Sequence, residues 1–368
     1  MSRVSVMLAC SGLGHVVRGY ERVTADLGRA LAVAVDVTVL RGGGPWLDRQ
    51  GLRIPCLQRR GRLARALVGS EEAAYALEQR SFAAGVFAWA RLRRPDVVHV
   101  HDPALMNALW HARRRLGASF SIVFTNGGWL DPRHLVRPDV VHCVTPVDAE
   151  RLRQAGFPRE KVVHVPYGID LPATSSQPWR GGTLNVVSVG ALTAQKGMHV
   201  AIRAVSRVPH AHLTMVGQEC DDTTTLRALA EELLPGRHAF RTVSPDEIDA
   251  VLRGAHVFLL ASSSEGFGMA VLEAMARGLP CLVSDVPVLR WLVGHGGHAV
   301  TRDDVDSWAL HLNALTPDRC AELSAAARAR AEEFAWSALV PKYVELYEHA
   351  SRRMDQGVPE QVRTQRVA

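Results

Sequence analysis

Apolar and polar positions alternate in blocks along the whole chain. Short runs rich in Val, Ile, Leu and Ala are typical of buried strands, and the segments between them carry apolar residues three and four positions apart, as helices do. The first block runs from strand Val4–Ala9 through Gly12-Leu13-Gly14 to helix His15–Leu31 and strand Val35–Leu40. This β-loop-α-β order predicts an α/β fold with a parallel, doubly wound sheet.

The alternation occurs twice, on either side of an irregular segment. Asp170–Gly182 is rich in Pro, Ser and Gly and has no periodicity, which is typical of a linker. For a chain of 368 residues we therefore expect two domains. The expected parts are a Rossmann-like domain at 1–170, a linker at 171–182, a second Rossmann-like domain at 183–335, a last helix at 336–352 and a flexible tail at 353–368. A ligand is expected at the carboxyl ends of the strands, in a cleft between the halves.

Composition narrows the class of protein. With 47% hydrophobic and 22% charged residues, and no apolar run of membrane-spanning length, we expect a soluble globular protein. The six cysteines form no CxxC pair, which favours reduced thiols and a cytoplasmic location. A net charge of +6 suits anionic ligands, but 43 basic against 37 acidic residues, with no long basic run, argues against nucleic acid. The arginine-rich segment Arg53–Val68 leaves peripheral membrane contact open, although a solvated helix face is the commoner outcome.

The stretch Leu259–Asp285 carries the clearest candidate chemistry. An apolar strand turns through Ser262–Ser264 into an almost wholly apolar helix, Met269–Arg277, that contains one carboxylate, Glu273. A buried carboxylate is costly unless something binds it. Glu265 precedes it by eight residues, so the two carboxylates could lie roughly 10 Å apart with a helix N-terminus between them. This spacing suits the hydroxyls and diphosphate of a ligand, although an ordinary strand-turn-helix with one satisfied glutamate would look the same.

This Glu-x7-Glu unit, in a chain of two Rossmann-like halves, resembles the GT-B glycosyltransferases, and most closely the retaining nucleotide-sugar enzymes of glycosyltransferase family 4. Other segments are also similar to that family: Val165–Asp170, Val189–Leu192 with Lys196-Gly197, Gly19-Tyr20-Glu21, and Phe334–Trp336 with Tyr343–Tyr347. The resemblance implies transfer of a hexose or N-acetylhexosamine, with retention, from a UDP-linked sugar to a hydroxyl of a small acceptor. It implies no bound cofactor or metal.

The resemblance also implies roles for individual residues. His101, Lys196 and Glu265 would be catalytic, with Lys196 neutralising the leaving diphosphate. The donor would be bound by Gly12, Gly14, Gly190, Lys196, Glu265, Gly266, Phe267, Gly268, Met269 and Glu273, and the acceptor by Asn126, Gly127 and Trp129.

The chain departs from the family pattern at three positions. Ala191 stands where an arginine usually completes the diphosphate clamp, and Arg290 is one possible substitute. Asn126 stands in place of a histidine, and Tyr167 in place of an asparagine. Either Gly12-Leu13-Gly14 or Arg18-Gly19 could form the first phosphate loop, and the former is favoured because it directly follows a strand.

Several alternatives remain open from the sequence. His101 could instead be a loop histidine bonded to Asp102, and His99 with His101 forms an HxH pair that lacks a third metal ligand. An NADP-dependent oxidoreductase is the enzyme rival, because Gly12-x-Gly14 follows a strand and Leu40-Arg41 ends the next one without an acid. The other two alternative functions are a sugar-nucleotide 2-epimerase of the same architecture and an inactive binding partner of a glycosyltransferase. The sequence does not specify the sugar, the acceptor or the oligomeric state.

Overall fold

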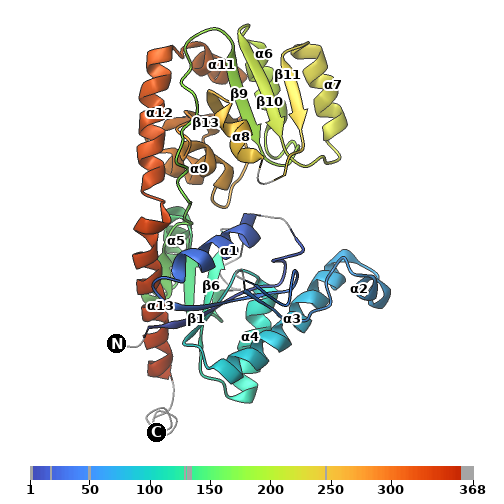
Figure 1. Ribbon diagram of the computed structural model, residues 1–368, viewed down its shortest axis with the longest axis vertical. Coiled ribbons are helices and arrows are strands. Elements are labelled where there is room, and N and C mark those ends of the chain that lie inside the picture. Colours follow the sequence, from blue (N-terminus) through green and yellow to red (C-terminus); the bar gives the residue numbers. More distant parts are fainter. Residues whose placement is uncertain are drawn as a thin grey trace. The chain divides into compact units, whose positions relative to one another are not determined.

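The protein consists of two compact α/β units, as seen in a computed structural model that describes residues 3–16, 19–48, 51–127, 130, 135–244 and 247–357. The first unit holds the chain up to Gly168 and again from Trp336 onward, and the second is Ile169–Ala335. Each is a Rossmann-like unit with helices packed on a mainly parallel sheet (Figure 1). The predicted fold class is confirmed.

The first unit is built on an eight-stranded sheet of order β3-β4-β2-β1-β5-β6-β7-β8, parallel except for the β3–β4 pair. Its strands are β1 (Ser5–Cys10), β2 (Asp36–Arg41), β3 (Leu47–Asp48), β4 (Gly51–Arg53), β5 (Val97–Val100), β6 (Ser121–Asn126), β7 (Val140–Cys143) and β8 (Val162–His164). Its helices are α1 (Gly19–Leu31), α2 (Arg62–Leu67), α3 (Glu71–Arg93), α4 (Pro103–Leu116), α5 (Pro146–Gln154), the 3₁₀ turn η2 (Arg159–Lys161) and α13 (Trp336–Gly357). The β3–β4 hairpin is not anticipated from the sequence, whereas α2 lies within Arg53–Val68, where a helix face is the commoner expectation.

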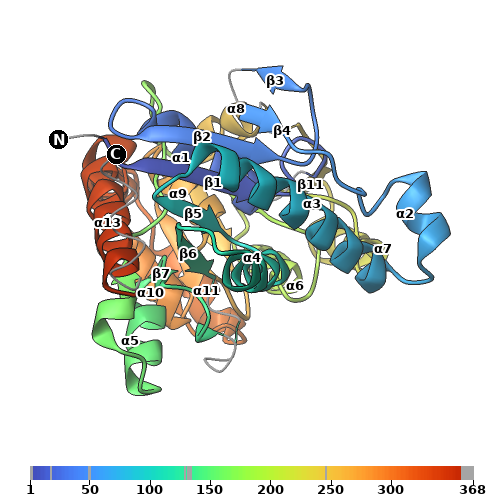
Figure 2. The ribbon, with the colours of Figure 1, turned by 90° about the horizontal axis from the view of Figure 1, so that it is seen from below.

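Both faces of this sheet are buried, as a parallel sheet requires. Met7 and Ala9 of β1 face one core with Phe82 and Val86 of α3, and α3 and α4 lie side by side there (Figure 2). Val6 and Leu8 alternate to the other face and are equally buried, so the strand reads as a continuous apolar run. α1 contacts β1 and β2, and a Cβ at Gly28 would lie 2.4 Å from the Val39 side chain.

The last helix, α13, joins the first unit through a buried chain of hydrogen bonds. Tyr347 Oη lies 2.8 Å from His99 Nδ1, and His99 Nε2 lies 2.6 Å from Thr125 Oγ1. Thr125 Oγ1 lies 2.8 Å from His142 Nδ1, and His142 Nε2 lies 2.7 Å from the Val165 carbonyl oxygen.

The Val165 carbonyl fixes the direction of this whole chain, because a carbonyl oxygen can only accept. His142 must donate from Nε2, so a neutral His142 accepts at Nδ1 from the Thr125 hydroxyl. Thr125 then accepts from His99 Nε2, and His99 accepts from the Tyr347 hydroxyl. Every polar atom of the chain is thereby used while both histidines stay neutral. Burial accordingly lowers the pKa of His142 to about 3 and that of His99 well below its usual value.

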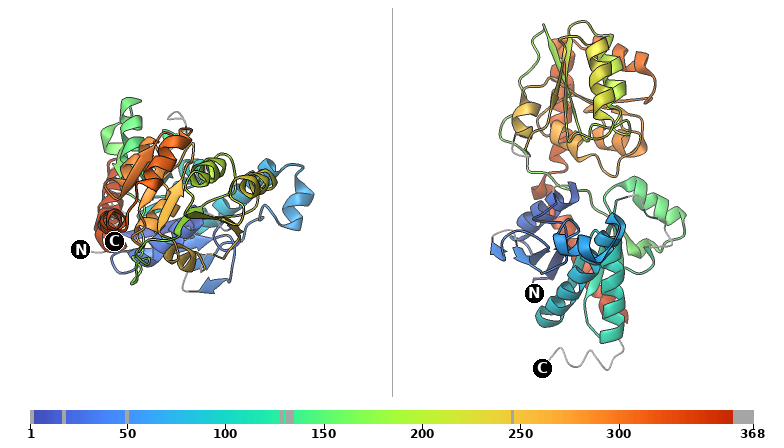
Figure 3. Two further views of the ribbon diagram at one scale, coloured as in Figure 1. Left: turned by 90° about the horizontal axis from the view of Figure 1, so that it is seen from above. Right: turned by 90° about the vertical axis from the view of Figure 1, so that its right-hand side faces the viewer.

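The second unit is built on a six-stranded, all-parallel sheet of order β11-β10-β9-β12-β13-β14. Its strands are β9 (Leu184–Val189), β10 (Ala211–Val216), β11 (His238–Arg241), β12 (Val257–Leu260), β13 (Cys281–Ser284) and β14 (Gly297–Val300). Its helices are α6 (Met198–Ser206), α7 (Thr223–Leu233), α8 (Ile248–Arg253), α9 (Met269–Met275), α10 (Pro287–Val293), α11 (Val305–Asn313) and α12 (Pro317–Glu332). α6, α7 and α11 bury apolar side chains in one core with alternate residues of the strands, and further views are given in Figure 3.

Three expected boundaries differ in the structure. α1 begins at Gly19 among the described residues, because Ser11–His15 form a turn rather than a helical start. The expected linker contains no helix or strand, yet Trp179 within it is buried in the core of the second unit. α13 extends to Gly357, beyond the predicted end at residue 352. Within the described ranges no helix has the length and apolar character needed to cross a membrane.

We expect the protein to lose stability on mild acidification. His99, His101 and His142 are buried and neutral, with the pKa of His101 lowered by burial to about 4. Their pKa values rise toward about 6.5 on unfolding, so the unfolded chain binds protons that the folded chain cannot. Urea unfolding should therefore give a free energy that is constant between about pH 7 and 8 and that falls from about pH 6.5 to 4. A free energy that stays constant down to pH 4.5 would contradict the neutral, buried histidines.

Candidate functional site

Each sheet offers one switch point at its carboxyl edge, and the predicted site residues gather at these two places. In the first unit β1 lies between β2 and β5, and in the second β9 lies between β10 and β12. Ligands of doubly wound folds bind where the strand order reverses. The loops after β1 and β5 carry Gly12, Gly14 and His101, and the loops after β9 and β12 carry Lys196 and Glu265.

Lys196 and Glu265 form an ion pair at the switch point of the second sheet. Lys196 Nζ lies 2.7 Å from Glu265 Oε1, with the side chains 27% and 11% exposed. The two residues are 69 positions apart in the sequence, with α6, β10, α7, β11, α8 and β12 between them, and the fold places them together. An ammonium group has three N–H donors, so two remain for other acceptors. The pair could therefore present a cation to a phosphate while the carboxylate accepts from hydroxyls.

The loop that carries Lys196 is held in place from two sides. Arg302 donates to the carbonyl oxygens of Ala194, at 2.7 Å, and of Ala261, at 3.1 Å. Ala194 N–H donates to Asp222 Oδ2 at 2.7 Å, and Ser263 N–H donates to the Gln195 carbonyl at 2.9 Å. These bonds tie the loop after β9 to the loop after β12. Arg302, which sequence reasoning did not identify, is itself paired with Asp303 at 3.0 Å.

Glycine is required at two positions of this site by the close approach of backbone. Gly197 has φ 72°, and a Cβ there would lie 2.0 Å from the Ala261 carbonyl oxygen. Gly268 has φ 96° at the N-cap of α9. Gly190 follows the last residue of β9 directly and Gly266 lies in the loop before α9. The Lys196 loop can therefore lie directly against β12.

Glu273 is half-buried rather than buried, which corrects the expectation drawn from its apolar helix. α9 turns Val271, Leu272, Ala274 and Met275 into the core, and leaves Met269, Ala270 and Glu273 on a partly exposed face. The carboxylate is therefore accessible, and its burial does not by itself demand a ligand. Phe267 contributes only backbone to this surface, because its ring is buried against Trp291 and Phe334.

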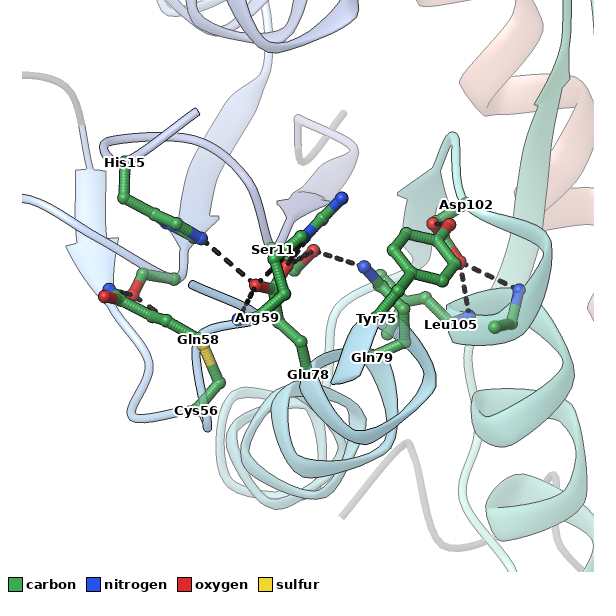
Figure 4. A network of polar contacts seen from close by, with 12 residues as sticks. Ser11, His15, Cys56, Gln58, Arg59, Tyr75, Glu78, Gln79, Asp102 and Leu105 are labelled. Atoms are coloured by element: carbon green, nitrogen blue, oxygen red, sulfur yellow. Dashed lines mark hydrogen bonds and ion pairs between the residues drawn. The ribbon is translucent and has the colours of Figure 1, made fainter. Parts of the chain in front are cut away.

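The glycine turn of the first unit is anchored by a buried carboxylate, Glu78 of α3 (Figure 4). Ser11 Oγ donates to Glu78 Oε1 at 3.1 Å, and His15 Nε2 lies 3.2 Å from Oε2. Arg59 donates to the same carboxylate from its backbone N–H at 2.7 Å and from Nη2 at 2.6 Å. Gln79 Nε2 completes the network by donating to Ser11 Oγ at 2.6 Å. The turn that would contact a diphosphate is thus held by side chains from two other segments.

The charge on Glu78 is stabilised by these donors. Burial alone would raise the pKa of Glu78, but the hydrogen bonds from His15 and Arg59 outweigh burial and lower its pKa to about 2. A buried ion pair is costly to break, by ~3–5 kcal/mol when one partner is removed. The Glu78–Arg59 pair therefore stabilises this edge of the sheet. No sequence motif indicates this pair.

His101 follows β5 and has two buried ring nitrogens with no hydrogen-bond partner among the described residues. Its ring stacks on His99 with centroids 5.1 Å apart and lies 6.2 Å from the ring of Tyr20. The alternative in which His101 bonds to Asp102 is wrong. Asp102 instead caps α4 and accepts from the Tyr75 hydroxyl. His99 uses both of its nitrogens in the chain to Tyr347 and Thr125, so it has no free lone pair to share with His101.

Asn126 is the second orphaned polar side chain at this edge. It ends β6, is fully buried, and neither amide atom has a partner in the part of the chain that the structure describes. β6 lies next to β5, so Asn126 and His101 end neighbouring strands. Gly127 follows at the same edge, and Trp129 and Arg18 lie outside the described residues. The predicted acceptor residues are thus placed beside His101 as far as they are described.

The missing arginine of the diphosphate clamp leaves an open position. Ala191 is exposed at the end of β9, and Arg290 is 60% exposed and paired with Asp285. Arg302 is better placed to compensate, because it bonds both loops that hold Lys196 and Glu265. From the sequence, Arg41 is a possible ligand of the 2′-phosphate of NADP. In the structure Arg41 is buried and donates to the Pro45 carbonyl at 2.9 Å.

Two family descriptions match the chain and together cover most of it. The family described as Glycosyl transferases group 1 matches residues 174–334, and the family described as Glycosyltransferase Family 4 matches residues 17–172. The boundary between the two matches lies near the division of the structure at Gly168. Each family match therefore corresponds to one unit of the fold.

Three curated relatives are 25–27% identical to this chain over the aligned residues. A lipopolysaccharide core biosynthesis glycosyltransferase of Rhizobium meliloti is 27% identical over 56% of this chain, and the match spans 64% of that relative. A GDP-mannose:cellobiosyl-diphosphopolyprenol alpha-mannosyltransferase of Xanthomonas campestris is 25% identical over 71% of this chain and 75% of its own length. A phosphatidyl-myo-inositol mannosyltransferase of Mycolicibacterium smegmatis is 27% identical over 70% of this chain and 72% of its own length.

Solved structures show the same fold at lower sequence identity. A sucrose-phosphate synthase from Thermosynechococcus elongatus superposes with a TM-score of 0.78 at 20% identity, covering 94% of this chain and 98% of that one. The Anabaena protein HepE, solved with UDP and glucose, gives 0.74 at 17% identity, covering 94% and 99%. Because both halves of the chain match glycosyltransferase families, the oxidoreductase alternative is wrong. The chain belongs to the GT-B glycosyltransferases of group 1 and resembles family 4, a class of hexosyltransferases.

Proposed function

We propose that this protein transfers a hexose or N-acetylhexosamine from a UDP-linked sugar to a hydroxyl of a small acceptor, with retention of anomeric configuration. The observation that carries the proposal is the Lys196–Glu265 pair at the switch point of the second sheet, beside a helix whose half-exposed face bears Glu273. In one reaction step the acceptor oxygen bonds to the anomeric carbon, the bond from that carbon to the diphosphate oxygen breaks, and the acceptor proton leaves with the diphosphate.

The residues have distinct roles in this proposal. Glu273 accepts hydrogen bonds from the ribose hydroxyls, and Lys196 neutralises the charge that develops on the leaving diphosphate. Glu265 holds hydroxyls of the transferred sugar while keeping its contact with Lys196. His101 is neutral near pH 7, since burial lowers its pKa to about 4, so it can exchange hydrogen bonds with sugar hydroxyls without adding charge. The backbone of the turn Gly12–Gly14 takes the diphosphate from the first unit.

The choice of UDP and of a cytoplasmic setting rests on separate support. UDP is favoured because HepE is a structural neighbour solved with UDP and glucose. All six cysteines are unpaired thiols, which supports a reducing compartment. The proposed reaction is tested by incubating the protein with a panel of nucleotide sugars and measuring nucleotide release and the thermal shift. A protein that neither binds nor cleaves any nucleotide sugar would contradict the proposal. Turnover of the nucleotide sugar to its 2-epimer without an acceptor would favour the epimerase instead.

Glu273→Gln should weaken UDP binding by ~1–3 kcal/mol, the range for a charged hydrogen bond that is lost while the shape is kept. Isothermal titration with UDP measures the effect. Glu232→Gln is the matched control, because Glu232 is an exposed glutamate on α7 that should leave the affinity unchanged. Equal affinity in a folded Glu273→Gln protein would show that Glu273 does not hold the ribose.

Lys196→Met should lower turnover more than it lowers affinity for the nucleoside. The substitution removes the cation and also releases Glu265, whose free carboxylate would then repel a diphosphate. The double variant Lys196→Met with Glu265→Gln separates the two effects, and it should recover part of the UDP affinity but not the turnover. Wild-type protein that binds uridine as tightly as UDP would show that this loop does not contact phosphate.

Ala191→Arg should tighten UDP binding, because Ala191 is exposed and its loop has room for a longer side chain. A charge-assisted hydrogen bond to phosphate is worth ~1.5–3 kcal/mol. Ala191→Gln is the control for size without charge and should have little effect. Weaker UDP binding by a folded Ala191→Arg protein would mean that another group, with Arg302 the nearest candidate, already occupies that place.

A further inference from the structure

The first unit contains a pocket of about 840 Å³ whose inner end is His101. Its walls come from α1, the residues just before α2, α2 itself with the segment that follows it, the start of α3 and the turn that begins α4. All of these residues belong to one unit, so the pocket is a feature of that unit alone. Arg59, Tyr75 and Asp102, which line it, are seen in Figure 4.

The inner end of the pocket is built for hydroxyl groups. Both nitrogens of His101 are buried and lack a partner among the described residues, although buried polar atoms are normally satisfied. A neutral imidazole offers one donor and one acceptor, and a hydroxyl group can complement either. A ligand with several hydroxyls would therefore satisfy the ring that the protein leaves unsatisfied.

The walls are aromatic and carry no surplus charge. Tyr20 and Tyr75 supply ring surfaces against which the apolar face of a ring-shaped ligand can pack. The Arg59 guanidinium lies 4.6 Å from the centroid of the Tyr75 ring, and its charge is balanced by buried Glu78 at 2.6 Å. Asp102 is occupied by the Tyr75 hydroxyl and by two N–H groups of α4.

The rim carries equal numbers of positive and negative groups. Arg60 and Arg65 lie on one side, and Glu71 and Glu72 form the first turn of α3. All four are exposed, and none forms an ion pair with any residue in the described ranges. The two carboxylates also offset the positive end of the α3 dipole. Sites for phosphate gather uncompensated arginines or bare helix N-termini, and this rim has neither.

We propose that this pocket binds the acceptor, and that the acceptor is an uncharged, polyhydroxylated ring such as a sugar, a cyclitol or a glycoside rather than a phosphorylated one. The inference rests on the proposed function and names the substrate class of its acceptor side. Carboxylates accept hydrogen bonds from hydroxyls, and guanidinium groups donate hydrogen bonds to them. The rim can therefore both accept from and donate to the hydroxyls of a neutral polyol. The reacting hydroxyl lies toward His101.

Matched acceptor pairs test the charge preference. Glucose and glucose 6-phosphate, and myo-inositol and its monophosphate, are supplied with the nucleotide sugar that the panel identifies, and acceptor-dependent nucleotide release is measured. In the pair that gives the higher activity, the neutral acceptor should have a kcat/KM at least about tenfold higher than that of the phosphorylated acceptor. Its KM should change less than about twofold between 50 and 300 mM salt, since no charge is being paired. A preferred phosphorylated acceptor with a salt-sensitive KM would overturn the inference.

Two double variants test whether the rim sets this preference. Glu71→Gln with Glu72→Gln leaves Arg60 and Arg65 uncompensated, so the phosphorylated acceptor should gain at least about fivefold in kcat/KM relative to its neutral partner. Arg60→Gln with Arg65→Gln should move the ratio the other way. Arg80→Gln, an exposed arginine on the same helix α3, is the control and should leave the ratio unchanged.

The outcomes separate the inference from the function on which it rests. Donor hydrolysis without acceptor reports the nucleotide-sugar site of the second unit. If the donor is hydrolysed and both double variants keep the wild-type acceptor ratio, the pocket does not bind the acceptor and the inference is wrong. If no nucleotide sugar is bound or cleaved by wild-type protein, the proposed function itself fails.

Discussion

Parallel strands place their carboxyl ends at one edge of a sheet, and this constraint positions most of the candidate site residues that the structure describes. β1 and β5 bring the glycine turn and His101 to one edge, and β9 and β12 bring Lys196 and Glu265 to another. The strands are buried on both faces, so apolar side chains fill them and polar groups are confined to the loops that follow. Because the sheets are rigid, they hold these loops in defined positions, although the loops are not regular secondary structure.

Buried polar networks supply that precision in the first unit. Glu78 gathers donors from the glycine turn and from Arg59, and the Val165 carbonyl orders four hydrogen bonds through His142 and Thr125 to Tyr347. A fully satisfied network in a low-dielectric interior is rigid, whereas a partly satisfied one is costly. His101 and Asn126 stand out because they end neighbouring strands and none of their side-chain nitrogen and oxygen atoms has a partner among the described residues, whereas His15 and Gln79 each lack a partner at one atom only. Ligand binding is the physical reason that best accounts for such a contrast.

In the second unit, the cation that we propose for the diphosphate is Lys196, and Ala191 stands where the resemblance to family 4 implies an arginine. Lys196 is paired with Glu265, and Arg302 donates to backbone carbonyls of the two loops that carry them. An ion pair at partial exposure contributes only ~0.2–1 kcal/mol, so the pair can exchange partners when a phosphate arrives.

The sequence by itself determined the fold class, the division into two α/β halves and most strands, because apolar runs and helical periodicity are local properties that the fold must bury. It also determined the Glu-x7-Glu unit, whose two carboxylates lie close in the chain. Only the tertiary structure paired Lys196 with Glu265, revealed Glu78 and Arg302, and showed Glu273 to be half-exposed. These features depend on which strands become neighbours and which helix face meets the sheet. Contacts between residues separated by crossovers leave no periodic signal in the chain, so the sequence could not specify them.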